Sequence, residues 1–143
     1  MIDRANIGRV FAPVVTVVDA PAVAAFRGAI GTVGATGVPF SDDDADTIPP
    51  TFPFCLEMLH VPTPFGVLDA LDVALPRLLH GEQHFRYHAP MRVGDTVTFT
   101  SRISDIYEKK NGALEFVVHD TDARDAHGTL LVEMRSVLVI RPA

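Results

Sequence analysis

Two carboxylates and two histidines occupy positions from which acid–base chemistry could be built. His80 and Glu82 stand two residues apart in the segment His80-Gly81-Glu82-Gln83, and Glu57 precedes His60 by three residues. A carboxylate and an imidazole held about one water apart can move a proton at a reacting group near neutral pH. Glu57 could pair with His60 or with His80. Each group also has a structural interpretation, with His80 as a hydrogen-bonded histidine at the start of a strand and Glu57 as the polar side of an amphipathic turn.

Other chemistries are disfavoured by the types of residue present. The acidic run Asp42–Asp46 lacks the central Gly and the downstream Glu of a calcium loop, so we interpret it as a solvated loop. No His or Cys cluster has metal-ligand spacing, and no Gly-rich phosphate loop follows a strand. The single cysteine, Cys55, excludes an internal disulfide, and its apolar neighbours indicate a small buried residue rather than a nucleophile. We therefore expect no metal and no resident cofactor.

Composition narrows the class of protein. The sequence has 143 residues, of which 48% are apolar, and this predicts one globular domain over residues 1–143. The formal charge of −6 disfavours nucleic acid as a partner, because phosphate binding relies on clustered Lys and Arg. The first residues show no signal peptide, and no apolar stretch approaches the ~18 residues of a membrane span. We expect a cytoplasmic protein with no membrane partner.

The first half of the chain must contain at least one good helix. Val14–Val18 is a β-branched run that predicts a short strand. Asp19 can then cap a helix that carries Pro21 in its first turn and ends at Gly31. Its predicted apolar face is formed by Val23, Phe26 and Ile30.

A second, buried helix has two candidate segments. Gly31–Pro50 has the composition of a loop, and it is followed by the apolar segments 51–59 and 65–79. Pro53 weakens the first candidate, whereas Gly66 and Pro76 weaken the second. The sequence leaves open which of them forms the helix.

Beyond Leu79 the chain reads as a β-meander. Strands are expected over 83–87, 96–106, 114–118 and 130–140, with a tight Asn-Gly hairpin at 110–113 and a polar turn at 125–128. Val137–Ile140 is apolar on both faces, so this stretch should lie centrally in the sheet or beneath a partner subunit. The pattern predicts an α+β protein with an antiparallel sheet. The side chains expected to face inward are Phe85, Tyr87, Val97, Phe99, Ile103, Leu114, Phe116, Val118, Leu130, Val132, Met134, Leu138 and Ile140.

The segment Leu79-His80-Gly81-Glu82-Gln83, followed by Pro90 and Gly94-Asp95, resembles the signature of MaoC-like dehydratases, specifically their amino-terminal type of hot-dog domain. Ile7–Val10 and Pro49–Phe54 fall in the family's order. The resemblance implies a long curved antiparallel sheet wrapped around a central helix, with two such domains paired as a dimer. It also implies an acyl-coenzyme A or acyl-carrier-protein substrate, held in a channel at the interface between the two domains.

The resemblance fails where catalytic members of the family carry their motif. These members place an Asp-x-Asn-Pro-x-x-His sequence directly after the Gly that ends the first helix. Here the residues after Gly31 are Thr32-Val33-Gly34-Ala35-Thr36-Gly37-Val38-Pro39-Phe40, with Thr32 where the carboxylate is expected. The chain therefore resembles the non-catalytic half of a paired (3R)-hydroxyacyl-thioester dehydratase, or enoyl-thioester hydratase, whose partner carries the Asp/His pair.

Two alternatives stay open beside this reading. One is a self-sufficient dehydratase or acyl thioesterase that uses Glu57 with a histidine, and the other is a homodimeric acyl-thioester binder without turnover. A mildly basic strip (His84, Arg86, His88 and Arg92) could contact the phosphates of coenzyme A or an acidic carrier protein, although a solvated strand face is favoured. The resemblance places near the channel the residues Pro50, Thr51, Phe52, Phe54, His80 and Gly81.

Overall fold

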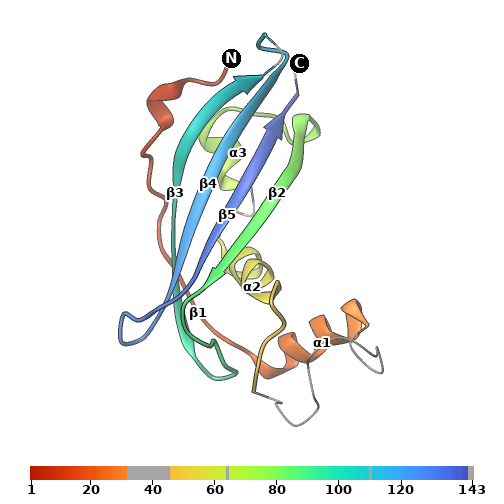
Figure 1. Cartoon of the computed structure of the whole chain (residues 1–143), viewed down its shortest axis with the longest axis vertical. Coiled ribbons are helices and arrows are strands. Elements are labelled where there is room, and N and C mark those ends of the chain that lie inside the picture. The colour runs from red at the N-terminus through yellow and green to blue at the C-terminus, as the bar shows by residue number, and fades with distance from the viewer. Residues whose placement is uncertain (32–45, 64, 110, 142–143) are drawn as a thin grey trace.

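The computed structural model describes residues 1–31, 46–63, 65–109 and 111–141. A five-stranded antiparallel sheet, with strand order β1-β3-β4-β5-β2, forms its main layer (Figure 1). The predicted α+β class with an antiparallel sheet is confirmed. The elements are the 3₁₀ turns η1 (Arg4–Asn6) and η2 (Leu75–Arg77), the helices α1 (Ala20–Ile30), α2 (Phe52–His60) and α3 (Gly66–Ala70), and the strands β1 (Val14–Val17), β2 (Leu78–Tyr87), β3 (Thr96–Lys109), β4 (Leu114–Asp125) and β5 (Leu130–Ile140).

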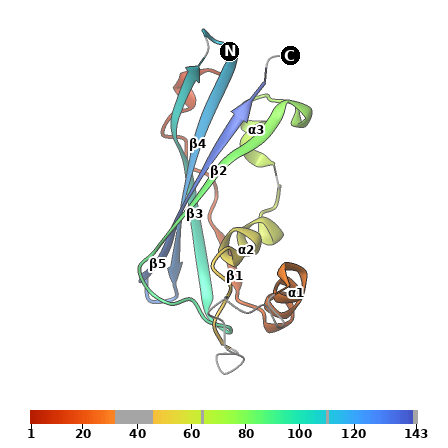
Figure 2. The same ribbon diagram turned by 45° about the vertical axis from the view of Figure 1, so that its right-hand side comes forward.

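The segment 51–59 supplies the central helix. Figure 2 shows α2 and α3 on one side of the curved sheet, and Phe52 and Leu56 of α2 are 1% and 0% exposed. Burying each of these side chains stabilises the fold by about 1.5–3 kcal/mol. Pro53 does not disrupt α2 because it lies in the first turn, where its missing N–H has no helical acceptor to lose.

The rival segment 65–79 is divided among three elements. Gly66 begins the five-residue helix α3, Pro76 lies in the 3₁₀ turn η2, and Leu78 opens β2. Proline cannot continue an α-helix because it lacks the N–H and its ring clashes with the preceding turn. The break therefore falls where the sequence placed it.

Helix α1 has the predicted caps. The Asp19 carboxylate accepts a hydrogen bond from the Ala22 amide at 3.1 Å, and Gly31 ends the helix with a left-handed φ of 73°. Val23 is buried and Phe26 contacts Phe52 edge to face, with ring centroids 5.5 Å apart. The inward prediction was wrong for Ile30, which is 48% exposed because it lies a turn beyond these contacts.

Strands β3 to β5 confirm most of the predicted pattern. Val97, Phe99 and Ile103 of β3 are buried, and the Asn111-Gly112 turn has the positive φ angles that a tight hairpin requires. Lys110 lies outside the described residues. On β5, Val137 and Ile140 are both buried although they point to opposite faces, since this strand lies between β4 and β2.

The predicted inward face of β4 was wrong. Phe116 stacks on Tyr107 on the outer face, with ring centroids 4.9 Å apart, whereas Val117 is fully buried on the inner face. A bulge between Ile103 and Asp105 of β3 shifts the register of the pair, so alternation cannot be carried through the hairpin from one strand to the next. The inner side chains of β4 are Val117, His119, Thr121 and Ala123.

Gly81 shapes another bulge of the sheet, at the pairing of β2 with β5. The register of β2 against β5 shifts between His80 and Glu82, so these two side chains point to opposite faces. A Cβ on Gly81 would lie 2.8 Å from Cγ2 of Val139 and 3.1 Å from the carbonyl oxygen of Val137. The backbone of β2 can approach β5 this closely only because residue 81 has no side chain.

We expect Gly81→Ala to lower the free energy of unfolding by about 1–3 kcal/mol, because the added methyl meets backbone as well as side chain. Gly28→Ala is the matched control, since a Cβ there meets nothing within 4 Å and Gly28 lies in a helix. The control should raise stability by about 0.5–1 kcal/mol. Urea denaturation of both variants checks this, and equal effects would contradict the close approach at Gly81.

Candidate functional site

A cavity of about 350 Å³ lies between α2 and α3 on one side and the inner face of the sheet on the other. Most of its wall is apolar, as in pockets that hold hydrocarbon chains. Among the described helices, none has the length and hydropathy required to cross a bilayer. The apolar wall of the cavity is formed mainly by Phe11, Phe54, Met58, Val61, Phe65 and Leu138.

Glu57 is the acid of this cavity. It lies on the side of α2 that faces the sheet, and it is only 7% exposed. The Thr121 hydroxyl donates to Oε1 of Glu57 at 3.3 Å. Burial raises the pKa of Glu57 to about 7, and the hydrogen bond from Thr121 offsets only part of this effect. Near neutral pH the carboxyl group can therefore act either as a donor or as an acceptor.

His119 is the imidazole that lies inside the cavity. Its Nε2 is buried and has no hydrogen-bond partner among the residues that the structure describes. The ring meets Phe11 edge to face, with centroids 5.6 Å apart. Burial lowers the pKa of His119 to about 4, although the negative charge of Asp120 acts in the opposite direction. His119 is neutral at pH 7.

A row of polar side chains crosses the inner face of the sheet. His119 of β4 is paired with Ser136 of β5, and Ser136 is paired with Gln83 of β2. The Ser136 hydroxyl donates to Oε1 of Gln83 at 2.6 Å, and Nε2 of His80 lies 3.0 Å from the same oxygen. The His80 ring also contacts Phe54, with centroids 5.4 Å apart. The row thus runs from the exposed edge of the sheet to its interior.

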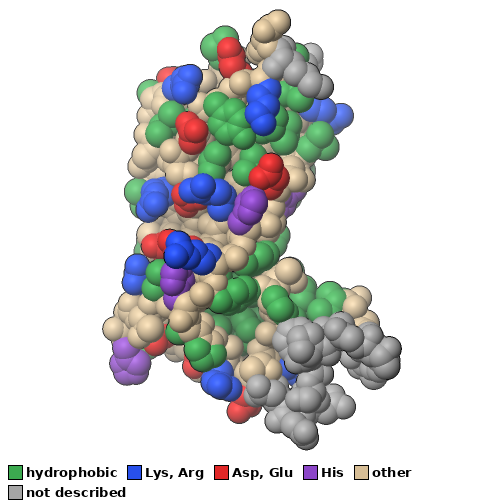
Figure 3. Space-filling model, in the orientation of Figure 1, with side chains coloured by type: hydrophobic (Ala, Val, Ile, Leu, Met, Phe, Trp, Pro, Cys, Tyr) green, Lys and Arg blue, Asp and Glu red, His purple; other side chains and the backbone are tan. Residues whose placement is uncertain are grey.

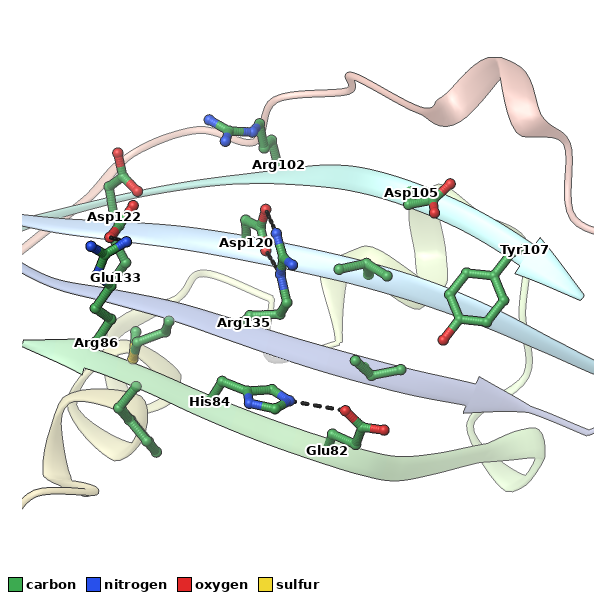
Figure 4. A pocket seen from close by; sticks show the side chains of 14 residues that line it. Glu82, His84, Arg86, Arg102, Asp105, Tyr107, Asp120, Asp122, Glu133 and Arg135 are labelled. Carbon is green, nitrogen blue, oxygen red and sulfur yellow. Dashed lines mark hydrogen bonds and ion pairs between the residues drawn. The ribbon is translucent and has the colours of Figure 1, made fainter.

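The structure unites some of the predicted acid–base residues and separates others. Glu57 and His80 line the same cavity. Glu82 instead lies on the outer face, where Oε2 is 2.9 Å from Nε2 of His84, so it forms no dyad with His80 (Figure 4). His60 Nδ1 lies 2.9 Å from the carbonyl oxygen of Leu56, one turn back on its own helix.

The six residues expected near the channel have different positions. Phe54 and His80 line the cavity. Phe52 was expected there, but it lies in the core, where an apolar ring at the start of α2 packs most favourably. Pro50, Thr51 and Gly81 are exposed and do not line the cavity. Residues 32–45, which include Thr32 and most of the acidic run, lie outside the described part of the chain.

The outer face of the sheet is charged but electrostatically balanced. It carries a shallow groove of about 630 Å³, in which Arg135 makes two hydrogen bonds to Asp120, at 2.7 and 2.9 Å. Nε2 of His88 lies 2.6 Å from a Glu133 oxygen, and Arg86 lies near the same carboxylate. Positive and negative side chains alternate over this surface (Figure 3). The predicted basic strip is therefore largely neutralised, which agrees with a solvated strand face.

Two further predictions concern reactive groups. Cys55 is half-buried and packs against the core, and burial raises the pKa of its thiol. This environment disfavours the thiolate form and supports a structural interpretation. Among the described residues, no cluster of His, Cys, Asp and Glu is arranged to hold a metal ion.

His119 was missed at the sequence level. It alternates with Val117, Thr121 and Ala123, a pattern that marks one face of a strand, but the alternation was assigned with the opposite phase. The signal was a histidine in register with small and apolar residues. The correct phase depends on the β3 bulge, which the sequence does not reveal.

Comparison with solved structures defines the class of fold. A MaoC-like dehydratase from Phytophthora capsici superposes with a TM-score of 0.76 at 21% identity, over 98% of this chain and 50% of that one. The HadBC (3R-hydroxyacyl-ACP dehydratase) complex of Mycobacterium tuberculosis gives 0.65 at 16% identity, over 90% of this chain and 94% of that one. The ChsH1-ChsH2 complex of the same organism gives 0.67 at 17% identity, over 94% and 86%. The fold is of the hot-dog type.

The family follows from sequence. Residues 5–134 match the model of the FAS1-like dehydratase domain region, and the chain belongs to this MaoC-like family. The UPF0336 protein of Thermobifida fusca is 34% identical over 94 residues, which are 65% of this chain and 59% of that protein. The UPF0336 protein of Streptomyces griseus is 34% identical over 106 residues, or 69% and 65%. The match thus spans about 59% to 65% of the length of these relatives.

Glu57→Gln removes the buried acid. The folded chain keeps the Glu57 proton up to a pKa of about 7, whereas the unfolded chain releases it near 4.5. Wild-type stability therefore falls as pH rises through this window, by about 3 kcal/mol. We expect the stability of Glu57→Gln relative to wild type to rise by that amount across the window, measured by urea denaturation. A difference that does not vary with pH would contradict an ionisable carboxyl buried at this position.

His119→Phe should have the opposite effect. Unfolding lets His119 take up a proton below its ordinary pKa of 6.5, while the folded chain resists protonation down to about 4. This group makes stability rise with pH between those values, by about 3 kcal/mol. The stability of His119→Phe relative to wild type should fall as pH rises from 4 to 6.5. In the wild type the two effects largely cancel, so a steep wild-type profile in this range would count against the assignment.

Proposed function

We propose that this chain is the channel-forming subunit of a (3R)-hydroxyacyl-thioester dehydratase, or enoyl-thioester hydratase. Residues 1–143 act as one hot-dog domain, and a partner of the same fold carries the catalytic Asp/His pair. One observation carries the proposal. An apolar cavity lies under α2 in a chain of a dehydratase family, but residues 32–40 after the first helix contain neither Asp nor His.

The cavity suits the acyl part of a thioester. Its walls are hydrocarbon and aromatic, so an acyl chain that enters loses unfavourable contact with water. Phe54 and His80 stand together where the cavity meets the sheet edge, and His80 is exposed. We assign substrate contact to these two residues, and the substrate is an acyl-coenzyme A or an acyl-carrier protein.

Partner binding is supported by the edge of the sheet. β2 is a terminal strand, so one side of its backbone has no neighbouring strand within the described chain. Such an edge favours pairing with another strand. Exposed apolar side chains lie on and near this edge, which is typical of protein interfaces. They are Leu75, in the turn η2 just before β2, and Leu79 and Tyr87 of β2 itself. The similar structures HadBC and ChsH1-ChsH2 are complexes, in agreement with pairing.

The activity should require a second chain. The purified protein is assayed with an enoyl-coenzyme A, alone and after co-expression with a MaoC-like chain from a neighbouring gene that has the intact Asp-x-Asn-Pro motif. We expect hydration only with the partner, because only the partner supplies the acid–base pair. Replacing the motif Asp of the partner by Asn should abolish it. Turnover by the single chain would contradict the proposal.

The edge itself can be tested with a charge. Leu79 is 48% exposed on β2, and Val15 is 63% exposed on β1 at the opposite edge. We expect Leu79→Glu to weaken association at least tenfold, because the carboxylate loses water at the interface. Val15→Glu should leave association unchanged. Analytical ultracentrifugation of the pair measures both, and equal effects would exclude β2 as the pairing edge.

The second candidate function is a self-sufficient dehydratase or acyl thioesterase. It is favoured by the buried Glu57, whose pKa of about 7 suits proton transfer, in one cavity with His80 and His119. Under this alternative the chain alone turns over an acyl thioester, and Glu57→Gln abolishes the activity. Binding of acyl-coenzyme A by a homodimer without turnover would instead support a non-catalytic acyl-thioester binder.

A further inference from the structure

The polar row on the inner face is satisfied at one end and open at the other. At the β2 edge, Oε1 of Gln83 receives the Ser136 hydroxyl and contacts His80. At the interior end, Nε2 of His119 is buried without a hydrogen-bond partner in the described chain. Ser101, one strand further along the sheet, also lines the cavity. The unpartnered Nε2 of His119 and the Ser101 hydroxyl thus lie in a cavity whose wall is mostly apolar.

A plain hydrocarbon chain would be a poor occupant of this part of the cavity. It would offer no hydrogen-bond partner to Nε2 of His119, which is buried and has none among the described residues. Leaving a buried polar group unpaired is unfavourable, and the penalty is larger than the gain from a typical hydrogen bond. In a channel that binds only alkyl chains, we would expect Val, Leu or Phe at positions 57 and 119.

We propose that the cavity accepts an acyl group that bears a hydroxyl or keto oxygen remote from the thioester, hydrogen-bonded by His119 with Ser101 and Glu57. This inference rests on the proposed function, and it deepens that function by naming the class of acyl group. The oxygen lies further along the chain than the 3-position at which water is added or removed. The partner's catalytic pair acts at that position.

The chemistry of the three side chains fits a hydroxyl oxygen particularly well. A neutral imidazole can donate or accept through Nε2, depending on its tautomer. The Ser101 hydroxyl can do either, and Glu57 donates when protonated and accepts when ionised. Because Thr121 already engages Oε1 of Glu57, the carboxyl group is held in place before the ligand arrives. A ligand hydroxyl therefore meets groups able to serve as both donor and acceptor.

The test compares saturated acyl-coenzyme A ligands of one length that differ only in a single hydroxyl, placed at successive carbons from position 5 outward. Isothermal titration calorimetry of the full chain gives each Kd. We expect one position to bind about tenfold more tightly than the unsubstituted ligand, the gain from one or two hydrogen bonds to buried partners. Equal affinity at every position would overturn the inference.

Two variants test the assigned residues. His119→Phe keeps a ring against Phe11 but removes Nε2, and Ser101→Ala removes only the hydroxyl. Each should reduce the ratio of the two affinities, His119→Phe to about one. The matched control is His84→Phe on the outer face, which should leave the ratio unchanged. A ratio that survives both cavity variants overturns the inference.

The outcomes also separate this inference from the proposed function. If the unsubstituted and the hydroxylated ligands bind equally well, the result agrees with the proposed channel subunit but contradicts the preference for an oxygenated acyl group. If no acyl-coenzyme A binds to the chain or to its complex with a partner, both fall. His119→Leu serves as a second variant if His119→Phe does not fold, because it also removes Nε2 and supplies no hydrogen-bonding group, so it should lower the ratio as well.

Discussion

The packing of α2 against the inner face of the sheet is the constraint on which the position of Glu57 and the shape of the cavity depend. Phe52 and Leu56 are almost fully buried there, and their packing against residues of β4 and β5 fixes the position of the helix relative to the sheet. The same contact forces Glu57 toward the strands, where Thr121 meets it. The space left between α2, α3 and the sheet becomes the cavity. Packing and site are thus consequences of a single arrangement, rather than separate parts of the molecule.

The sheet contributes its own asymmetry to this arrangement. Its outer face is covered by paired charges, such as Arg135 with Asp120, and these remain hydrated. Its inner face is mostly apolar but carries the row that joins His119, Ser136 and Gln83, with Thr121 and Ser101 nearby. Polar residues in such a position are costly unless they have partners. Ser136 and Gln83 partner each other, whereas Nε2 of His119 has no partner among the described residues.

Local features of the fold could be predicted from the sequence, whereas features set by two strands together could not. The Asp19 cap, the Gly31 terminus and the Asn111-Gly112 hairpin depend on a few adjacent residues, and all three were found. In contrast, the side chains of His80 and Glu82 point to opposite faces of the sheet because β2 has a bulge where it pairs with β5. Within the sequence of β2, only Gly81 indicates this bulge.

The same distinction applies to the candidate site. Glu57 could be singled out because an acid within an apolar helical segment is unusual, and the cavity contains it. His119 could not, because its orientation depends on the phase of β4, which the β3 bulge changes. The motif segment after α1 was read from residue types alone, and residues 32–45 lie outside the described structure. The family assignment rests on the match over residues 5–134 and is independent of these details.

The buried carboxyl on α2 has one more consequence. Because the fold retains a proton at Glu57 that water would remove, the molecule exchanges protons with its buffer whenever the surroundings of this group change. An occupant that donates to the carboxylate would release a proton, and one that accepts from the acid would take one up. The heat of ligand binding therefore includes the ionisation heat of the buffer. The sign of this buffer-dependent part shows whether protons are released or taken up, and thus whether the ligand donates a hydrogen bond to the carboxylate or accepts one from the acid.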